Sequence, residues 1–298
     1  MKYREQAVDF VCEGEQLLGI VCGPADVTAA TDRGVVIVVG GPQYRAGSHR
    51  QFVLLARALA ARGHHCLRFD YRGMGDGGGP ARSFDQVSAD IHAAIKTLQA
   101  HCPEVRRIAL WGLCDGASAS LLYLQTYGAH ARADGLCLLN PWVRSEASLA
   151  KTQVKHYYAQ RLLQKTFWLK LLRGGTGWRA VREFVGKLRT ANQRGPGPAS
   201  ARASYQERMS AAWQAFAGPM LLLLSGNDLV AKEFLDHAKA VPAWSGLLDR
   251  PGLERHELPT ADHTFSTALW RSQAEDLTAR WLDQWPPSAP NAVAVATC

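Results

Sequence analysis

Short, almost wholly apolar runs recur along this chain and alternate with segments of helical character. The runs are GVVIVVGG (34–41), HHCLRFDY (64–71), VRRIALWG (105–112), GLCLLNPW (135–142) and GPMLLLLS (218–225). Strands that are buried on both faces read as continuous apolar stretches, and this is typical of parallel sheets covered by helices. The alternation therefore predicts an α/β fold with a mostly parallel central sheet and helices on both faces.

The chain begins with a different pattern. EQAVDFVCEG (5–14) and EQLLGIVCGP (15–24) meet at a glycine-containing turn, which predicts an antiparallel hairpin ahead of the α/β alternation. Apolar spacing predicts helices from about Ser48 to Arg62 and from about Ser83 to Gln99. After LERHELP (253–259), a terminal helix is expected over HTFSTALWRSQAEDLTARWLDQW (263–285), with His263 at its start.

Residues 143–216 interrupt this series, since they contain no convincing strand before the seventh one. We therefore expect a core formed by 1–142 and 217–285, with 143–216 inserted as a helical lid. The tail PPSAPNAVAVATC, 286–298, is expected to be disordered.

The basic character of the chain is concentrated in the predicted lid. The whole chain has a net charge of +8, but the stretch from Arg144 to Arg208 alone holds five Lys and nine Arg against three acidic residues. Because one segment carries the excess, we expect no general nucleic-acid-binding surface. Residues 156–174 read as a basic amphipathic helix, which we expect to contact substrate. Peripheral contact with an anionic membrane and a merely solvated basic face both remain open.

Cysteine usage and hydropathy indicate a compartment. Seven cysteines occur without a C-x-x-C pair, several of them inside apolar runs, which favours free thiols in a reducing cytoplasm. The first residues lack the apolar core of a signal peptide, and no run approaches the roughly 20 residues that span a bilayer. We therefore expect a cytoplasmic protein.

The sharpest chemical signal is WGLCDGASAS (111–120). Gly112-Leu113-Cys114-Asp115-Gly116 follows a predicted strand and opens a predicted helix, which is the context of a nucleophile elbow. The turn lifts its central side chain above the sheet edge, and the helix N-terminus favours negative charge there. Cys114 is therefore the expected nucleophile; the alternative is a buried thiol beside a glycine-rich turn.

A cysteine nucleophile needs a base, and the base needs an orienting acid. In the order nucleophile, acid, histidine, the acid is Asp228 after the strand GPMLLLLS, and the base is His263 in the segment ADHTF. Asp249 and Asp262 compete with Asp228 for the acid role. Asp249 lies in a loop before the last strand, and Asp262 is adjacent to His263, too close to present its carboxylate readily.

The oxyanion hole is expected to use two backbone N–H groups. One belongs to Asp115, the residue after the nucleophile, and the other to the loop GGPQYR (40–45). Pro42 has no N–H to donate, so Gln43 is the better candidate and Gly41 the second choice.

The same loop region also carries Arg45, His49 and Arg50. They could bind an anionic group of the substrate, or they could be surface charges that flank the start of a helix.

These ordered motifs resemble the α/β-hydrolase superfamily over the whole chain apart from the lid. GGPQYRAGSHRQF, FDYRGMGD and LWGLCDGASA are more narrowly similar to the exosortase A system-associated hydrolase 1 family. That resemblance implies a bacterial cytoplasmic hydrolase connected with exopolysaccharide production and PEP-CTERM protein sorting. Most superfamily members use serine, so Cys114 departs from the majority pattern and favours a reactive ester, a thioester or acyl transfer; dienelactone hydrolases also use cysteine there.

Two classes of function follow. The first is acyl chemistry on a small-molecule or lipid-linked acyl substrate through Cys114, His263 and Asp228, ending in hydrolysis or in transfer to a sugar or amine. The second is a non-catalytic binding or scaffold member of the fold. The sequence shows no metal-ligand cluster and no phosphate-binding glycine loop, so we expect neither a metal nor a cofactor.

Overall fold

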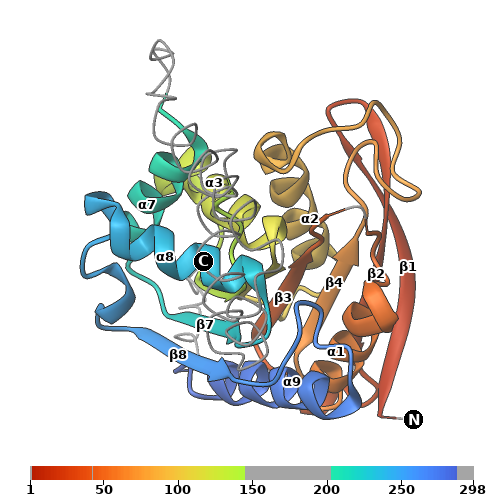
Figure 1. Cartoon of the computed structure of the whole chain (residues 1–298). Coiled ribbons are helices and arrows are strands. Elements are labelled where there is room, and N and C mark those ends of the chain that lie inside the picture. Colours follow the sequence, from red (N-terminus) through yellow and green to blue (C-terminus); the bar gives the residue numbers. More distant parts are fainter. Residues whose placement is uncertain (1, 42, 145–202, 287–298) are drawn as a thin grey trace, which may run out of the picture.

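The computed structural model describes residues 2–41, 43–144 and 203–286. Within them, eight strands form one sheet in the order β1-β2-β4-β3-β5-β6-β7-β8 (Figure 1). The strands are β1 (Tyr3–Cys12), β2 (Glu15–Pro24), β3 (Arg33–Val38), β4 (His65–Phe69), β5 (Arg107–Leu113), β6 (Gly135–Leu139), β7 (Met220–Ser225) and β8 (Leu253–Leu258).

The sheet is mixed but mostly parallel. β1 pairs antiparallel with β2 around a turn at Glu13 and Gly14, and β2 pairs antiparallel with β4. All further pairs, from β4 through β8, are parallel. The predicted hairpin and the predicted α/β sheet are thus confirmed. Because β3 to β8 run in one direction, they end on one edge of the sheet, the carboxyl edge, and begin on the other, the amino edge.

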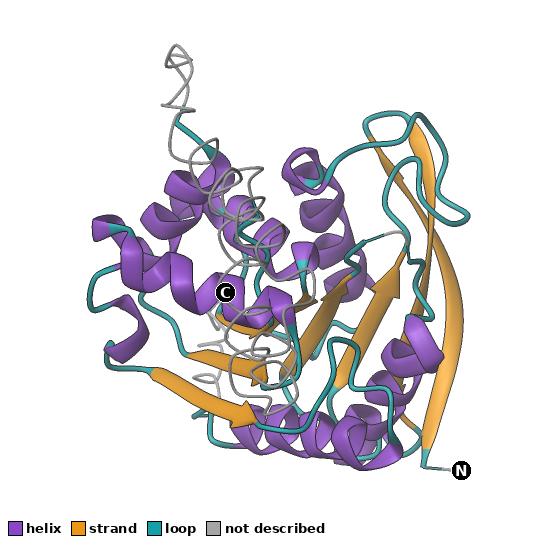
Figure 2. Ribbon diagram, in the orientation of Figure 1, coloured by secondary structure: helices purple, strands orange, loops and turns teal. Residues whose placement is uncertain are grey.

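Helices cover both faces of this sheet (Figure 2). α1 and α9 pack together on one face, whereas α2 and α3 pack together on the other, where α7 lies against α3 (Figure 1). The helices are α1 (Gln51–Ala60), α2 (Ser88–His101), α3 (Asp115–Tyr127), α7 (Tyr205–Ala215), α8 (Leu229–Ala240) and α9 (Ala268–Asp283).

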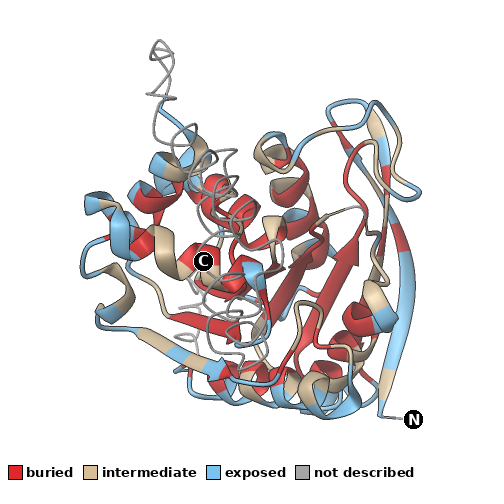
Figure 3. Ribbon diagram, in the orientation of Figure 1, coloured by how far each residue is buried: buried red, intermediate tan, exposed pale blue. Residues whose placement is uncertain are grey.

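The core lies in the central strands, where Figure 3 shows continuous burial. Every residue of β4, β6 and β7 is buried, as the sequence predicts, although β4 includes His65 and Arg68. A fully buried leucine or valine contributes about 1.5–3 kcal/mol. The face under α1 is further fixed by Phe52 and Trp111, whose rings meet edge to face at 5.7 Å. The strands whose C-terminal ends lie on the carboxyl edge are therefore tightly packed.

Several helices begin later than the sequence predicts. α1 starts at Gln51 because His49 and Arg50 have φ angles of 52° and 59°, which interrupt a helix. α2 starts at Ser88, after a short 3₁₀ turn at Phe84–Gln86. α9 starts at Ala268, so the segment around 263 lies in the loop before it.

The predicted insertion 143–216 ends in α7, which belongs to the packed body. Ser204 and Glu207 form a capping box at its start, and Trp213 is fully buried. Residues 145–202 of the predicted lid, with its helix at 156–174, and nearly all of the predicted tail lie outside the described residues. In the described part of the chain, no helix is long and apolar enough to cross a membrane.

Candidate active site

Cys114 lies at a sharp turn on the carboxyl edge. It is the one residue between β5 and α3, with φ 61° and ψ −125°, a backbone conformation that is costly for a residue with a side chain. The flanking glycines are sterically required. A Cβ at Gly112 would lie 2.5 Å from the carbonyl of Gly116, and one at Gly116 would lie 2.4 Å from the carbonyl oxygen of Val38. The turn thus has the geometry of the predicted nucleophile elbow.

Accessibility separates Cys114 from the other described cysteines. It is partly exposed, whereas Cys12, Cys22, Cys66, Cys102 and Cys137 are buried. Burial raises the pKa of the Cys12 and Cys102 thiols to about 11, so these groups remain protonated at neutral pH. Within the described residues, Cys114 is therefore the thiol best placed to meet a substrate.

His263 and Asp228 meet at the same edge. Nδ1 of His263 lies 2.8 Å from Oδ2 of Asp228, within hydrogen-bond distance. Asp228 follows β7 and caps α8, where its carboxylate accepts hydrogen bonds from the N–H groups of Val230 at 3.0 Å and Ala231 at 3.3 Å. The carboxylate is 7% exposed, so it is a fixed acceptor for the imidazole.

The imidazole of His263 is held in its charged form. Burial alone would lower its pKa, but interactions with Asp228 and with the thiol of Cys114 raise the pKa to about 10. An imidazolium beside a thiol stabilises the thiolate, which is the nucleophilic form of cysteine. The three side chains therefore form one electrostatic unit.

The two competing acids lie elsewhere. Asp262 accepts a hydrogen bond from the N–H of Ser266 at 2.9 Å and another from its hydroxyl, so it stabilises the loop before α9. Asp249 ends a 3₁₀ turn at Leu247–Asp249 ahead of β8. Of the three acids named from the sequence, Asp228 is the one that contacts His263.

Asn140 was not singled out in the sequence, yet it supports this geometry. It directly follows β6, is fully buried and has a positive φ of 45°. Its Oδ1 accepts from the N–H of Ser225 at 2.8 Å, while its Nδ2 donates to Oγ of Ser225 at 2.9 Å and to the carbonyl of His263 at 3.3 Å. The Asn140 amide thus connects the ends of β6 and β7 by hydrogen bonds to the loop between β8 and α9, which contains His263 and is called the histidine loop below. The sequence did contain a signal for this role: Asn140 is a polar residue directly after the apolar run GLCLL, at the C-terminal end of a predicted strand.

Asp115 links the elbow to the loop after β3. Its carboxylate accepts a hydrogen bond from the N–H of Gly41, and burial raises its pKa. The backbone N–H groups of Asp115 and Gly116 interact with the same carboxylate, so the N–H of Asp115 is occupied in the same way as that of Gly41. Gln43 and Asp115 therefore stay predictions as the two oxyanion donors, and the N–H of Asp115 must exchange its own carboxylate for the substrate oxygen. Oε1 of Gln43 accepts from the N–H of Ser48 at 3.0 Å and so holds the loop in place.

The three basic residues named as substrate contacts have different surroundings. Arg45 forms ion pairs with Asp70 and, at 2.6 Å, with Asp76, so its guanidinium is engaged by two carboxylates. His49 and Arg50 lie in the strained turn before α1. His49 interacts electrostatically with Asp262, the residue that precedes His263.

A mostly parallel sheet of this order, with an elbow after β5 and a histidine–aspartate pair from the loops after β7 and β8, defines the α/β-hydrolase class. Within it, the chain belongs to the family described as Serine aminopeptidase, S33, whose profile matches residues 30–240. The matched stretch includes Cys114 and Asp228 and ends before His263.

Similar solved structures show the same fold. An esterase of Pyrococcus furiosus aligns with a TM-score of 0.63 and 17% identity, covering 95% of this chain and 92% of that one. A structure from a study of two fungal esterases of Rhizomucor miehei aligns with a TM-score of 0.60 and 15% identity, covering 94% and 83%. A Xanthomonas campestris protein described as a serine hydrolase without a lid gives 0.56 and 16%, covering 95% and 97%. No curated protein matches the chain significantly in sequence.

Proposed function

We propose that this chain hydrolyses an ester or thioester through an acyl-cysteine formed on Cys114. The observation that carries this proposal is a partly exposed thiol on a strained elbow, beside a histidine that a buried aspartate holds. The likeness to structures described as esterases supports an ester-like substrate. A sulfur nucleophile suits activated carbonyl groups, because the thioester it forms is itself reactive toward water.

In the first half of the reaction, the thiolate of Cys114 attacks the substrate carbonyl carbon. The carbonyl electron pair moves onto oxygen, and the N–H groups of Asp115 and Gln43 stabilise that oxyanion. The tetrahedral intermediate then collapses, and the bond to the leaving alkoxide or thiolate breaks. The leaving group takes a proton from His263, which leaves an acyl-cysteine and a neutral imidazole.

In the second half, water attacks the acyl-cysteine. Neutral His263 accepts a proton from the water, and Asp228 stabilises the imidazolium that forms. A second oxyanion collapses, the carbon–sulfur bond breaks, and the carboxylic acid leaves. The thiolate–imidazolium pair is then restored for the next cycle.

A sugar hydroxyl or an amine in place of water would turn the same intermediate into an acyl donor. The likeness of GGPQYRAGSHRQF, FDYRGMGD and LWGLCDGASA to exosortase A system-associated hydrolase 1 supports a lipid-linked or small acyl substrate in exopolysaccharide and sorting systems. The basic stretch 144–208 supports an anionic substrate or peripheral contact with an anionic membrane. A non-catalytic scaffold has no need of an elbow, a histidine and an acid together.

The deciding experiment is to trap the intermediate. The reduced protein is mixed with p-nitrophenyl esters, acyl thioesters and aminoacyl amides of varied chain length, quenched in acid and weighed by intact mass spectrometry. We expect a one-acyl adduct that maps to Cys114 and is lost in Cys114→Ala, while Cys12→Ala keeps it. A full-yield adduct in Cys114→Ala, or no adduct with any substrate, would refute the proposal. Added glycerol or amine then separates transfer from hydrolysis by the products formed.

A further inference from the structure

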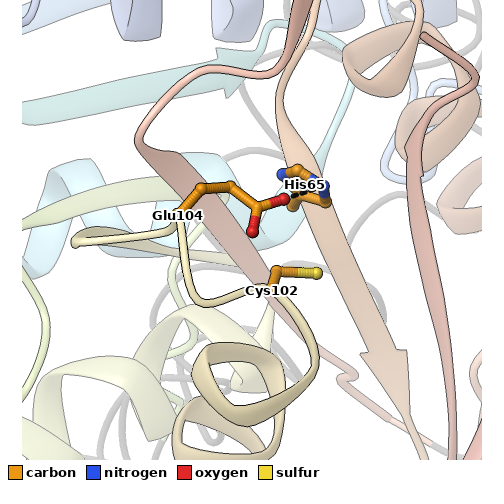
Figure 4. Close-up of side chains that lie close together, drawn as sticks. All are labelled: His65, Cys102 and Glu104. Atoms are coloured by element: carbon orange, nitrogen blue, oxygen red, sulfur yellow. Dashed lines mark ion pairs between the residues drawn. The ribbon is translucent and has the colours of Figure 1, made fainter. Parts of the chain in front are cut away.

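A second group of cysteine, histidine and carboxylate lies at the amino edge of the sheet (Figure 4). His65 is the first residue of β4, Cys102 is the C-cap of α2, and Glu104 follows in the loop to β5. One ligand atom from each, a ring nitrogen, a sulfur and a carboxylate oxygen, lies within 4.8 Å of the other two. Two segments of the chain, the start of β4 and the connection from α2 to β5, therefore converge there, at the end of the strands opposite to Cys114.

The imidazole of His65 is unusual among buried polar groups. The side chain is 1% exposed, and neither ring nitrogen makes a hydrogen bond. Nε2 does lie 3.0 Å from Oε1 of Glu104, a close contact whose geometry is not that of a hydrogen bond. Buried polar atoms without a partner are rare and costly, and they point to a ligand or ion that completes the site.

We propose that His65, Cys102 and Glu104 form a binding site for a zinc ion. The donor set of imidazole nitrogen, thiolate and carboxylate oxygen is one that zinc accepts in tetrahedral sites. Zinc bonds of about 2.0–2.3 Å place tetrahedral ligand atoms about 3.3–3.8 Å apart. The present separations of 3.0 Å and of at most 4.8 Å bracket that range, so only small side-chain movements are needed.

Charge and space also suit a dication. The thiolate and the carboxylate together neutralise two positive charges, which removes the cost of an unpaired charge next to the core. Gly23 of β2 leaves room for the ring, since a Cβ there would lie 2.6 Å from Cδ2 and 2.9 Å from Nε2 of His65. Cys102 is 3% exposed, whereas Glu104 is 40% exposed. Water can therefore reach the fourth coordination position, and we expect the ion to exchange with solvent.

The positive charge of Arg4 lies near the proposed site and should weaken zinc binding, so its removal tests the proposal. Arg4 of β1 pairs across the strands with Gly23, and its exposed guanidinium acts electrostatically on both His65 and Cys102. Removal of this charge should tighten zinc binding. A cluster with no metal-binding role would show no such gain.

The experiment uses the full chain, reduced and freed of metal with a chelator, with Cys114→Ala as parent so that the exposed thiol cannot compete. Zinc affinity is measured against a chromophoric chelator, and cobalt is added separately to detect the thiolate-to-metal charge-transfer band. We expect one equivalent of zinc and a cobalt–thiolate band. Cys102→Ala should lose both, and Glu104→Gln should weaken zinc binding about tenfold or more. Arg4→Gln should strengthen it.

Matched controls are Cys12→Ala, another buried thiol, and Glu257→Gln, an exposed strand carboxylate 55% exposed. Both should bind zinc as the parent does. If Cys102→Ala fails to fold, which circular dichroism reports, Glu104→Gln and Arg4→Gln decide. Parent-like zinc affinity in both of those variants, or no binding by the parent at micromolar zinc, would overturn the proposal.

Discussion

The two edges of the sheet carry the same three kinds of side chain, but the carboxylate and the thiol exchange places in their exposure to solvent. At the carboxyl edge the carboxylate of Asp228 is buried, His263 is 32% exposed, and the thiol of Cys114 is partly exposed. At the amino edge, Cys102 and His65 are buried while the carboxylate of Glu104 reaches solvent.

This reversal indicates that exposure, more than composition, sets the chemistry. A buried acid that is satisfied by a helix N-terminus can orient a histidine toward a thiol that substrates can reach. A solvent-facing carboxylate in front of a buried thiol and imidazole presents negative charge to incoming cations instead. The contrast that we propose is between attack on an electrophile at the carboxyl edge and binding of a cation at the amino edge.

The largest effect should come from removing the exposed thiol. We expect Cys114→Ala to abolish turnover and acyl-enzyme formation, because the other cysteines that the structure describes are buried. Circular dichroism should show an intact fold, since little volume is lost. Cys12→Ala is the control and should retain activity. Turnover by Cys114→Ala at the wild-type rate would show that Cys114 is not the nucleophile, and the two edges would then not differ in the way we propose.

The next effect tests whether the carboxyl-edge residues act as a unit. His263→Ala should lower kcat by about 10³-fold or more, and adding Asp228→Asn should lower it little further, since the acid acts through the histidine. The measurement is steady-state kinetics on the single and double variants. If the two losses multiply in full, Asp228 is not the orienting acid, and Asp262 and Asp249 become the residues to test.

A moderate effect is expected at Asn140, the support of the histidine loop. Asn140→Ala leaves Ser225 and the His263 carbonyl without their partner, so we expect a loss of about 1–3 kcal/mol in the free energy of unfolding. The displaced loop should also lower kcat about tenfold. Thr278→Val, which removes a buried hydroxyl from α9, is the control for stability loss alone. Equal kcat in the two variants would make Asn140 a purely structural residue.

The last prediction concerns the pH dependence of stability, with no change expected in the kinetic contrast between the edges. The pKa of His263 is raised from 6.5 to about 10 in the folded protein, so the folded state binds its proton more tightly than the unfolded state. Its contribution to stability is therefore fully present below pH 6.5 and is lost as pH rises through about 10. Denaturant unfolding of wild type and His263→Gln should show their stability difference shrinking over this range. A difference independent of pH would mean that the imidazole is not held charged.

The sequence was sufficient to predict the sheet, the elbow and the partner of His263. Parallel strands end on one edge of the sheet, so the elbow after β5, the acid after β7 and the histidine after β8 share that edge. Because β7 and β8 are neighbouring strands, Asp228 and His263 can meet there. Glycines at 112 and 116 showed the elbow because no other residue fits against the backbone there.

What the sequence missed depends on contacts between side chains distant along the chain. The role of Asn140 arises from the position of the His263 carbonyl, and the engagement of Arg45 arises from Asp70 and Asp76. The amino-edge cluster joins residues 65, 102 and 104, whose spacing matches no metal-binding motif. The early start predicted for α1 was wrong for a local reason, since positive φ angles at His49 and Arg50 leave no trace in apolar periodicity.

The steric constraints at the elbow act on the backbone and on the two glycines, and they leave the identity of the nucleophilic atom free to change in evolution. The strained φ at Cys114 constrains the backbone, and the tight contacts fall on the neighbouring glycines, so the turn itself does not select the atom at the tip of the side chain. Exchange of sulfur for oxygen alters one atom and no backbone angle. If Cys114 acts as we propose, this member of a family named for serine would differ from a serine enzyme at the tip of one side chain and not in the backbone of the elbow.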